Sequence, residues 1–304
     1  MYSLSTCWNS HRHTDGRAML REIRGLGFEY AELSHGIRLG LVSGILEAVD
    51  AGEIKISSLH NFCPLPLGVN HASPNLYEFS DERPRQRELA VKYTLKTLDF
   101  AERVKAPAIV LHLGRMEMKD YTEKLGAMLE RDGKKSPQYE KLRAEAAAKR
   151  EANKGKVVER VYDTLRIILP EAEKRGLKLG IENRQALEEI PLEADFEFFF
   201  REFDRPNVVY WHDIGHGQIK ENLGFLHPVQ HLESLASRIA GFHIHDVVFP
   251  VGDHAAPGTG TVDFAALRPF VQPGHIKVFE LSPSLPIQAV QCGVAHVKII
   301  WGNE

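Results

Sequence analysis

Short apolar runs rich in β-branched residues alternate along the chain with segments whose apolar residues recur at helical spacing. The apolar runs lie at residues 2–7, 28–33, 54–59, 108–111, 177–181, 208–211, 239–242 and 276–279. Helical spacing is found at 17–26, 86–105, 157–175, 192–203, 226–237, 263–270 and 286–300. Strands that alternate with helices are typical of a parallel sheet. Eight such units in 304 residues favour a closed (β/α)8 TIM barrel that occupies the whole chain, 1–304, as a single α/β domain.

The alternative for alternating strands and helices is an open, doubly wound sheet, which usually carries a glycine-rich turn after its first strand. The nearest sequence of this kind is Gly258-Thr259-Gly260. It comes late in the chain and lacks a third glycine. We interpret it as a loop before Asp263, a residue type that caps helices. The pattern therefore favours the closed barrel.

One segment, residues 115–156, interrupts the alternation after the fourth predicted strand. It holds 20 charged residues among 42, of which 12 are basic and 8 acidic. Its tract at 140–150, Glu-Lys-Leu-Arg-Ala-Glu-Ala-Ala-Ala-Lys-Arg, favours a solvated helix. We interpret the segment as a charged helical insertion on the face where barrel active sites lie. It forms either a solvated surface hairpin, as charge runs usually do, or a lid or subunit contact.

The overall composition argues against several classes of protein. Charged residues make up 26% of the chain and hydrophobic residues 43%, which excludes a mostly disordered or fibrous chain. A formal net charge of −3 argues against a broadly basic nucleic-acid binder. No apolar run reaches the ~18 residues of a membrane span, and residues 1–7 lack a signal-peptide pattern. Three sparse cysteines, Cys7, Cys63 and Cys292, give no disulfide framework. We expect a cytoplasmic protein without a nucleic-acid or membrane partner.

The predicted strands end in polar residues that share one chemistry. In chain order, strands three to eight end at His60, His112, Glu182, Asp213, His243 and Glu280. The carboxyl ends of all barrel strands open onto one mouth, so these side chains should meet there. Each alone could be a packing residue or the partner of an arginine. Ionisable groups gathered in one cavity repel one another and lose hydration, which a fold tolerates mainly around a cation or a reaction. The recurrence therefore predicts a divalent-metal site.

Shorter motifs add candidates near the same mouth. Asp213-Ile214-Gly215-His216 places a second potential ligand one turn beyond the sixth strand. In His243-Ile244-His245-Asp246 the two histidines alternate along a strand, so they point the same way and Asp246 points opposite. Asp253-His254 then precedes a turn-rich loop at 257–260. The predicted site thus extends into the segments that follow the strands.

An ordered set of motifs falls at the strand ends: Ile181-Glu182-Asn183, Asp213-x-Gly215-His216, His243-x-x-Asp246, His254-x-x-Pro257-Gly258-x-Gly260-x-x-Asp263-Phe264 and Phe279-Glu280. As a set it resembles the xylose isomerase-like TIM barrels. That superfamily contains sugar (phosphate) isomerases and epimerases and the AP endonuclease family 2 type. The resemblance covers most of the chain and is weakest across 115–156. Because one fold hosts many reactions, it says more about the fold than about the substrate.

The resemblance also implies a ligand set. In the ketose epimerases one Mn²⁺, Co²⁺ or Mg²⁺ is held by residues that match Glu182, Asp213, His243 and Glu280, and the two glutamates act as acid and base. In the endonuclease IV type a trinuclear Zn²⁺ site uses further histidines, which match His60, His112, His216 and His254. That type carries an aspartate two residues before the last histidine. This chain has Gly252 there, and Asp253 is out of register by one.

Several functions stay open at this point. We favour a divalent-metal-dependent sugar isomerase or epimerase, in which Glu182 and Glu280 move a proton next to a carbonyl through an enediolate. The second hypothesis is a zinc-dependent hydrolase of phosphodiesters, although the acidic net charge argues against DNA as its substrate. A lyase acting on oxidised sugars would begin with the same proton removal. The last hypothesis is a barrel that binds a sugar or a metal ion without catalysing a reaction.

The partners follow from the favoured function. They are a small carbohydrate substrate and, by resemblance to a superfamily in which dimers and tetramers are common, a second copy of the chain. Candidate substrate contacts are His216, Arg184 and the apolar side chains Trp8, Phe62 and Trp211. Barrel packing is the alternative role for the three aromatic residues.

Overall fold

Eight parallel strands close into a barrel in the computed structural model, which describes residues 1–69, 71–72 and 75–303. The strands are β1 (Tyr2–Ser5), β2 (Tyr30–Leu33), β3 (Lys55–His60), β4 (Ala108–Leu111), β5 (Lys178–Glu182), β6 (Val208–Asp213), β7 (Ile239–Ile244) and β10 (Ile276–Phe279). Their order around the barrel is β1-β10-β7-β6-β5-β4-β3-β2, and every neighbouring pair is parallel. The predicted (β/α)8 barrel is confirmed, and each predicted apolar run overlaps one of these strands.

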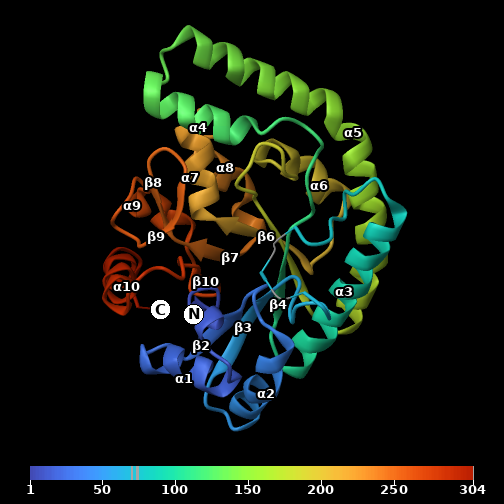
Figure 1. Ribbon diagram of the computed structural model, residues 1–304, viewed down its shortest axis with the longest axis vertical. Coiled ribbons are helices and arrows are strands. Elements are labelled where there is room, and N and C mark those ends of the chain that lie inside the picture. Colours follow the sequence, from blue (N-terminus) through green and yellow to red (C-terminus); the bar gives the residue numbers. More distant parts are fainter. Residues whose placement is uncertain (70, 73–74, 304) are drawn as a thin grey trace.

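Helices surround the barrel (Figure 1). They are α1 (Gly16–Gly25), α2 (Val42–Asp50), α3 (Pro84–Arg103), α4 (Tyr121–Asp132), α5 (Pro137–Lys174), α6 (Phe196–Glu202), α7 (Ile214–Asn222), α8 (Pro228–Leu235), α9 (Phe264–Leu267) and α10 (Ile287–Trp301). A large apolar cluster fills the space between these helices and the strands. Among the described residues, no helix is both long and apolar enough to cross a membrane.

The charged segment 115–156 contains α4 and the first half of α5. Figure 1 shows these two helices crossing the top of the view as a green hairpin. Asp120 caps α4 by accepting a hydrogen bond from the backbone of Glu123. The structure differs from the expectation at the end of the segment, because α5 continues unbroken for 38 residues. The helix predicted at 157–175 is therefore the second half of this long helix and not a separate element.

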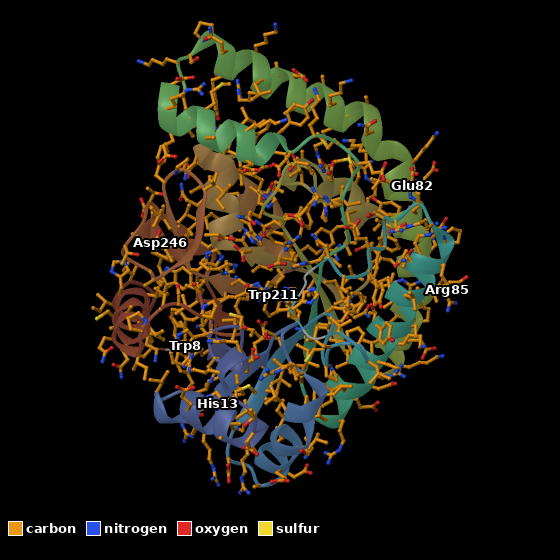
Figure 2. The ribbon with its side chains drawn as sticks, in the orientation of Figure 1. Trp8, His13, Glu82, Arg85, Trp211 and Asp246 are labelled. Carbon is orange, nitrogen blue, oxygen red and sulfur yellow. The ribbon has the colours of Figure 1, made fainter. Side chains whose placement is uncertain are left out.

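Two glycines let a tryptophan fill the interior of the barrel. Trp211 on β6 has no exposed surface and packs with Ala108, Val110, Ile276 and Val278. A Cβ on Gly180 of β5 would lie 2.9 Å from the indole, and one on Gly241 of β7 would lie 2.5 Å from it. Figure 2 shows Trp211 near the middle of the molecule. The indole thus forms a solid floor below the carboxyl ends of the neighbouring strands.

Candidate metal centre

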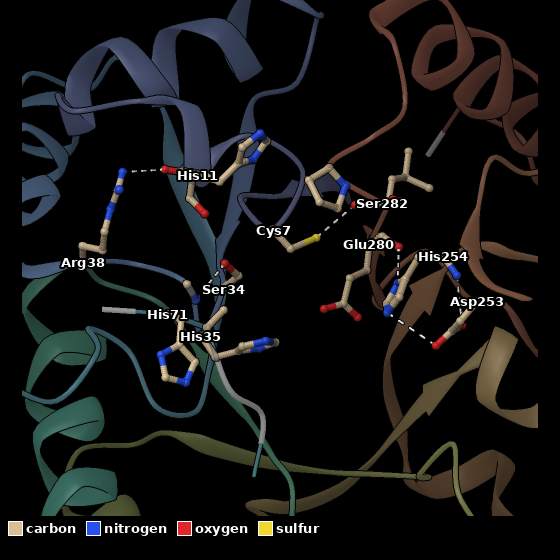
Figure 3. Close-up of a pocket in the computed structure, with 15 residues that line it drawn as sticks. Cys7, His11, Ser34, His35, Arg38, His71, Asp253, His254, Glu280 and Ser282 are labelled. Atoms are coloured by element: carbon tan, nitrogen blue, oxygen red, sulfur yellow. Dashed lines mark hydrogen bonds and ion pairs between the residues drawn. The ribbon is translucent and has the colours of Figure 1, made fainter. Parts of the chain in front are cut away.

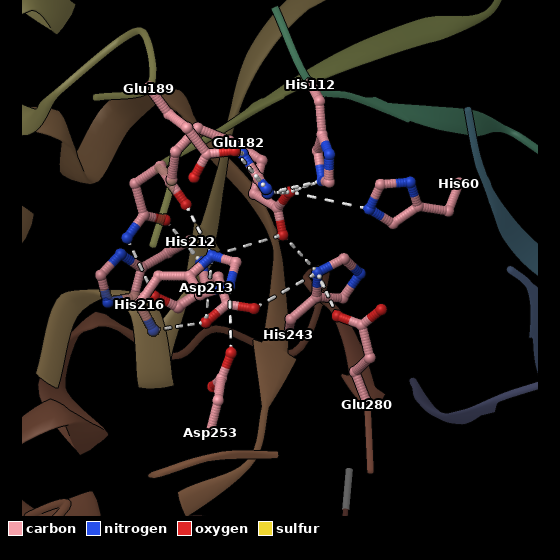
Figure 4. Close-up of polar contacts among 12 residues, drawn as sticks. His60, His112, Glu182, Glu189, His212, Asp213, His216, His243, Asp253 and Glu280 are labelled. Carbon is pink, nitrogen blue, oxygen red and sulfur yellow. Dashed lines mark hydrogen bonds and ion pairs between the residues drawn. The ribbon is translucent and has the colours of Figure 1, made fainter. Parts of the chain in front are cut away.

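Four ionisable side chains meet at the carboxyl ends of β5, β6, β7 and β10. Glu182, Asp213, His243 and Glu280 each offer one ligand atom, and these atoms all lie within 4.8 Å of one another (Figure 4). None of the four residues is more than 4% exposed, and Asp213 and His243 have no exposed surface. The predicted set of four ligands is therefore gathered in one buried cluster.

The Nδ1 atom of His243 lies at the centre of this cluster. It is 2.8 Å from Oε1 of Glu182, 3.1 Å from Oε2 of Glu280 and 3.7 Å from Oδ2 of Asp213. Burial lowers the pKa of His243, but the carboxylates of Glu280 and Glu32 outweigh burial and hold this pKa well above its ordinary value. Three carboxylates around one imidazole are a donor set that suits a hard or borderline divalent cation. The cluster therefore fits a metal ion by its chemistry.

Glu32 on β2 lies on the other side of the His243 ring. Its Oε2 atom is 3.1 Å from Nε2 of His243 and accepts a hydrogen bond of 2.7 Å from the hydroxyl of Ser58. A carboxylate that accepts the second ring N–H of a histidine orients the ring and leaves the other nitrogen free to ligate. Glu32 lies inside β2 and not at its end, so the pattern of polar residues at strand ends missed its role as the partner of His243.

A second group of potential ligands borders the first. His60, His112 and Glu182 each bring one ligand atom, a ring nitrogen or a carboxylate oxygen, within 4.8 Å of the other two. Oε2 of Glu182 is 2.5 Å from Nε2 of His112 and 3.6 Å from Nε2 of His60. Arg184 reaches into this group, since its Nη1 atom lies 2.8 Å from the same Glu182 oxygen. Burial raises the pKa of Glu182, but His112 and Arg184 outweigh burial and hold it well below its ordinary value.

A third group lies beyond Asp213 and consists of His216, His245, Asp253 and His254. The Asp213 carboxylate caps α7 by accepting the backbone N–H of His216 at 2.7 Å, which turns His216 toward the cluster. Oδ1 of Asp253 lies 3.2 Å from Nδ1 of His245, and Nε2 of His245 lies 3.0 Å from Oδ1 of Asp213. His245 thus connects the third group to the first.

By sequence, Asp253 lies one residue away from the position expected for a ligand. The hairpin formed by β8 (Asp246–Val248) and β9 (Gly252–Ala255) nevertheless brings its side chain into the third group. His254 has a φ of +53°, in the left-handed region that a non-glycine residue rarely adopts. Successive side chains therefore do not point to opposite faces of the strand here. The side chains of Asp253 and His254 approach each other, with Oδ2 and Nε2 3.5 Å apart. Asp253 joins the group although Gly252 occupies the expected position.

The opposite orientation of Asp246 has a clear structural role. Its carboxylate accepts backbone N–H groups of Gly258, Gly260 and Val262 at 2.9, 2.9 and 3.0 Å. These bonds hold the loop that leads to α9, where Asp263 accepts the N–H of Ala266 as the helix cap. Asp246 therefore shapes the rim of the site from outside the ligand groups.

A cavity of about 550 Å³ opens beside the first and third groups. Figure 3 shows Glu280, Asp253 and His254 on one wall and His35, His71 and Arg38 on the other. Of the four clustered ligands, Glu280 is the one that lines this cavity. Its volume lies within the range of pockets that bind small organic ligands.

The three aromatic residues expected as substrate walls do not line this cavity. Trp8 is 1% exposed and donates its indole N–H to the carbonyl of Leu285 at 2.9 Å. Phe62 is 2% exposed and packs edge-on against Tyr77. Trp211 lies in the floor, with its ring centroid 5.4 Å from that of His243. In the structure their contacts are those of core packing.

Comparisons with known proteins agree with this architecture. The model of the family described as xylose isomerase-like TIM barrel matches residues 20–277. Among curated proteins, none matches the sequence.

Solved structures of similar fold include several sugar epimerases. A D-tagatose 3-epimerase-like protein is 17% identical with a TM-score of 0.67, covering 98% of this chain and 96% of its own. The 3-keto-D-glucoside 4-epimerase from E. coli is 17% identical with a TM-score of 0.67, covering 98% of both chains. The D-psicose 3-epimerase from Clostridium cellulolyticum H10 is 12% identical with a TM-score of 0.65, covering 99% of both chains. At these identities the likeness shows a shared fold.

Proposed function

Because the chain belongs to the xylose isomerase-like TIM barrel family, we propose that it is a divalent-metal-dependent sugar isomerase or epimerase. The observation that carries this proposal is the buried cluster of Glu182, Asp213, His243 and Glu280 at the edge of a cavity large enough for a sugar. Structures of similar fold are named as a D-psicose 3-epimerase, a 3-keto-D-glucoside 4-epimerase and a D-tagatose 3-epimerase-like protein. A small carbohydrate is therefore the proposed substrate.

The four clustered residues would hold the metal ion. A bound Mn²⁺, Co²⁺ or Mg²⁺ supplies Lewis-acid polarisation of a carbonyl oxygen and its neighbouring hydroxyl, and Zn²⁺ is the alternative if histidines of the other groups ligate. The Glu32 carboxylate accepts a hydrogen bond from Nε2–H of His243. This bond fixes the ring proton on Nε2 and directs Nδ1 into the cluster. The indole of Trp211 closes the floor of the barrel, which keeps water out from below.

The two glutamates are placed to exchange protons with a substrate from different sides. Glu182 ends β5 and Glu280 follows β10, and these strands are three positions apart around the barrel. One carboxylate removes the proton from the carbon next to the carbonyl, and the other returns a proton to the opposite face, which inverts that carbon. Return of the proton to the neighbouring carbon would give isomerisation with the same residues.

A second candidate is metal-dependent hydrolysis of a phosphodiester. The observation that favours it is the presence of further potential ligands beside the first group, among them His60 with His112, and His216 with His245, Asp253 and His254. Hydrolases of this kind use two or three ions about 3.5–4 Å apart. The two candidates predict different metal contents, which makes them separable.

Exchange with deuterated water tests the proposal directly. The purified protein with added Mn²⁺ is incubated with a panel of ketoses in D₂O, and the sugars are followed by NMR. We expect deuterium at the carbon next to the carbonyl and the appearance of an epimer or isomer. Absence of exchange with every ketose, together with cleavage of a phosphodiester probe and two or three Zn²⁺ per chain, would instead establish the hydrolase.

A further inference from the structure

Arg184 lies inside a group of side chains that otherwise has the composition of a metal site. Its Nη1 atom is 2.5 Å from Nε2 of His112 and 2.8 Å from Oε2 of Glu182. Both residues belong to the second group of potential ligands, in which Oε2 of Glu182 also lies 3.6 Å from Nε2 of His60. We propose that Arg184 is a built-in cation of the His60–His112–Glu182 group and excludes a divalent metal ion from it. The proposal rests on the function proposed above, because it concerns the same barrel mouth.

The first reason is the lone pair of His112. A neutral imidazole has one unprotonated ring nitrogen, and a histidine must present that nitrogen to ligate a metal. Nε2 of His112 faces the Nη1 hydrogens of Arg184, so its lone pair accepts a hydrogen bond. Nη1 carries two hydrogens and can direct one to His112 and one to Glu182. The lone pair therefore cannot serve a metal ion at the same time.

The second reason is charge. An arginine side chain stays protonated in proteins, and this one is only 5% exposed. Two carboxylates neutralise it, because Glu189 accepts from Nη2 at 3.0 Å while Glu182 accepts from Nη1. Oε2 of Glu182 and Nε2 of His112 lie 2.5 Å apart, and Nη1 of Arg184 contacts both atoms, at 2.8 and 2.5 Å. The guanidinium therefore brings its positive charge to the same two atoms that would face a metal ion.

The third reason is that Arg184 is held on both sides. Its backbone carbonyl accepts a hydrogen bond from the buried ammonium of Lys220. The carboxylate of Glu189 is itself fixed by Asn75 at 3.1 Å and by the backbone of Ala186 at 3.0 Å. A metal ion would have to displace a guanidinium from this network and leave Glu189 buried without its partner, which is costly.

The consequence is that the barrel carries fewer ions than its histidines suggest. A hydrolase of the two-metal type needs two ions about 3.5–4 Å apart, and the second group, beside Glu182, is one place for the second ion. Arg184 occupies that side of Glu182 with a fixed positive charge, while Oε1 of the same carboxylate faces His243. This arrangement leaves the first and third groups for metal ions and separates this chain from a site that holds zinc in all three groups.

Metal stoichiometry tests the inference. Wild-type protein and variants are stripped with a chelator, titrated with Zn²⁺ alone by calorimetry, desalted and analysed for zinc per chain. In Arg184→Met combined with Glu189→Gln, the group is opened without leaving an unpaired carboxylate, and we expect one Zn²⁺ more per chain than in the wild type. Adding His112→Ala to this variant should return the count to the wild-type value.

The control is Arg150→Met, which removes another buried arginine. Arg150 is 4% exposed and paired with Asp195, and its loss should leave the zinc count unchanged.

His112→Ala in the otherwise unchanged chain gives an independent answer, whether or not the Arg184 variants fold. We expect its Zn²⁺ count to equal that of the wild type. A lower count would show that His112 already ligates and would overturn the inference, as would an opened variant that folds and gains no ion. A wild-type protein that binds no Zn²⁺ or Mn²⁺ at all would instead refute the proposed function.

Discussion

Nε2 of His243 lies 3.1 Å from Oε2 of Glu32, and neither residue has exposed surface. The ring is therefore held between β2 and the carboxylates of β5 and β10. Partners of this kind fix the tautomer and raise the basicity of a ligating histidine, and their loss typically weakens metal binding 10–100-fold. We expect Glu32→Ala to weaken Mn²⁺ binding by this factor in calorimetric titration. Ser58→Ala, which removes a donor to Glu32 but leaves the carboxylate in place, should have a much smaller effect. Equal affinity in a folded Glu32→Ala protein would contradict this role.

The acid–base assignment predicts complete loss of turnover in Glu182→Gln and in Glu280→Gln. A glutamine amide neither accepts nor returns a proton at neutral pH, so inversion next to a carbonyl cannot proceed. Initial rates with the substrate found by deuterium exchange, together with bound metal per chain, separate lost chemistry from lost metal. Glu188→Gln is the matched control, because Glu188 is buried and accepts the backbone N–H of Tyr121, the first residue of α4, at 2.6 Å. Substantial activity in both site variants would defeat the assignment.

Sequence patterns predicted the strands because a barrel strand is buried on both sides and reads as a short apolar run. The residue after each run then had to lie at the common mouth, which is why Glu182, Asp213, His243 and Glu280 could be named in advance. Helix α7 was missed. Its sequence, Ile-Gly-His-Gly-Gln, has little intrinsic helix preference, and the helix depends on the Asp213 cap and on burial.

Other features of the site could not be read from the chain. The pairing of Arg184 with His112 joins residues 72 positions apart and depends on how β4 and β5 are aligned. The approach of Asp253 to His254 depends on the left-handed backbone angle of His254, which histidines adopt too rarely for the sequence to predict it. Trp211 and Asp213 lie on the same face of β6, but only the packing around Gly180 and Gly241 decides that the indole fills the floor while the carboxylate reaches the mouth.

The close packing of Trp211 in the floor of the barrel predicts that a side chain at Gly241 destabilises the protein. A Cβ there would lie 2.5 Å from one indole carbon of Trp211 and 2.6 Å from another, closer than real contacts allow. Since the indole is enclosed by β4 and β10, it cannot move away freely. We expect Gly241→Ala to lower the free energy of unfolding by about 1–3 kcal/mol in urea titration. Gly25→Ala is the control, because nothing lies within 4 Å of its Cβ and alanine favours the helix. Equal stability of Gly241→Ala and wild type would show that the floor is loosely packed.

The burial of His231, a histidine away from the ligand groups, predicts that the protein loses stability as the pH falls. His231 on α8 is 8% exposed, and its Nε2 atom lies 2.8 Å from the hydroxyl of Tyr210. Burial lowers the pKa of His231 from 6.5 to about 4. Below pH 6.5 the unfolded chain takes up a proton that the folded chain takes up only near pH 4, so stability is lost as the pH falls through this window. The loss amounts to at most about 3 kcal/mol. His231→Gln keeps a hydrogen-bonding partner for Tyr210 but does not titrate, and urea unfolding between pH 7 and pH 4 should show a shallower decline than in the wild type. Parallel declines in the two proteins would show that His231 protonates equally in the folded and unfolded states.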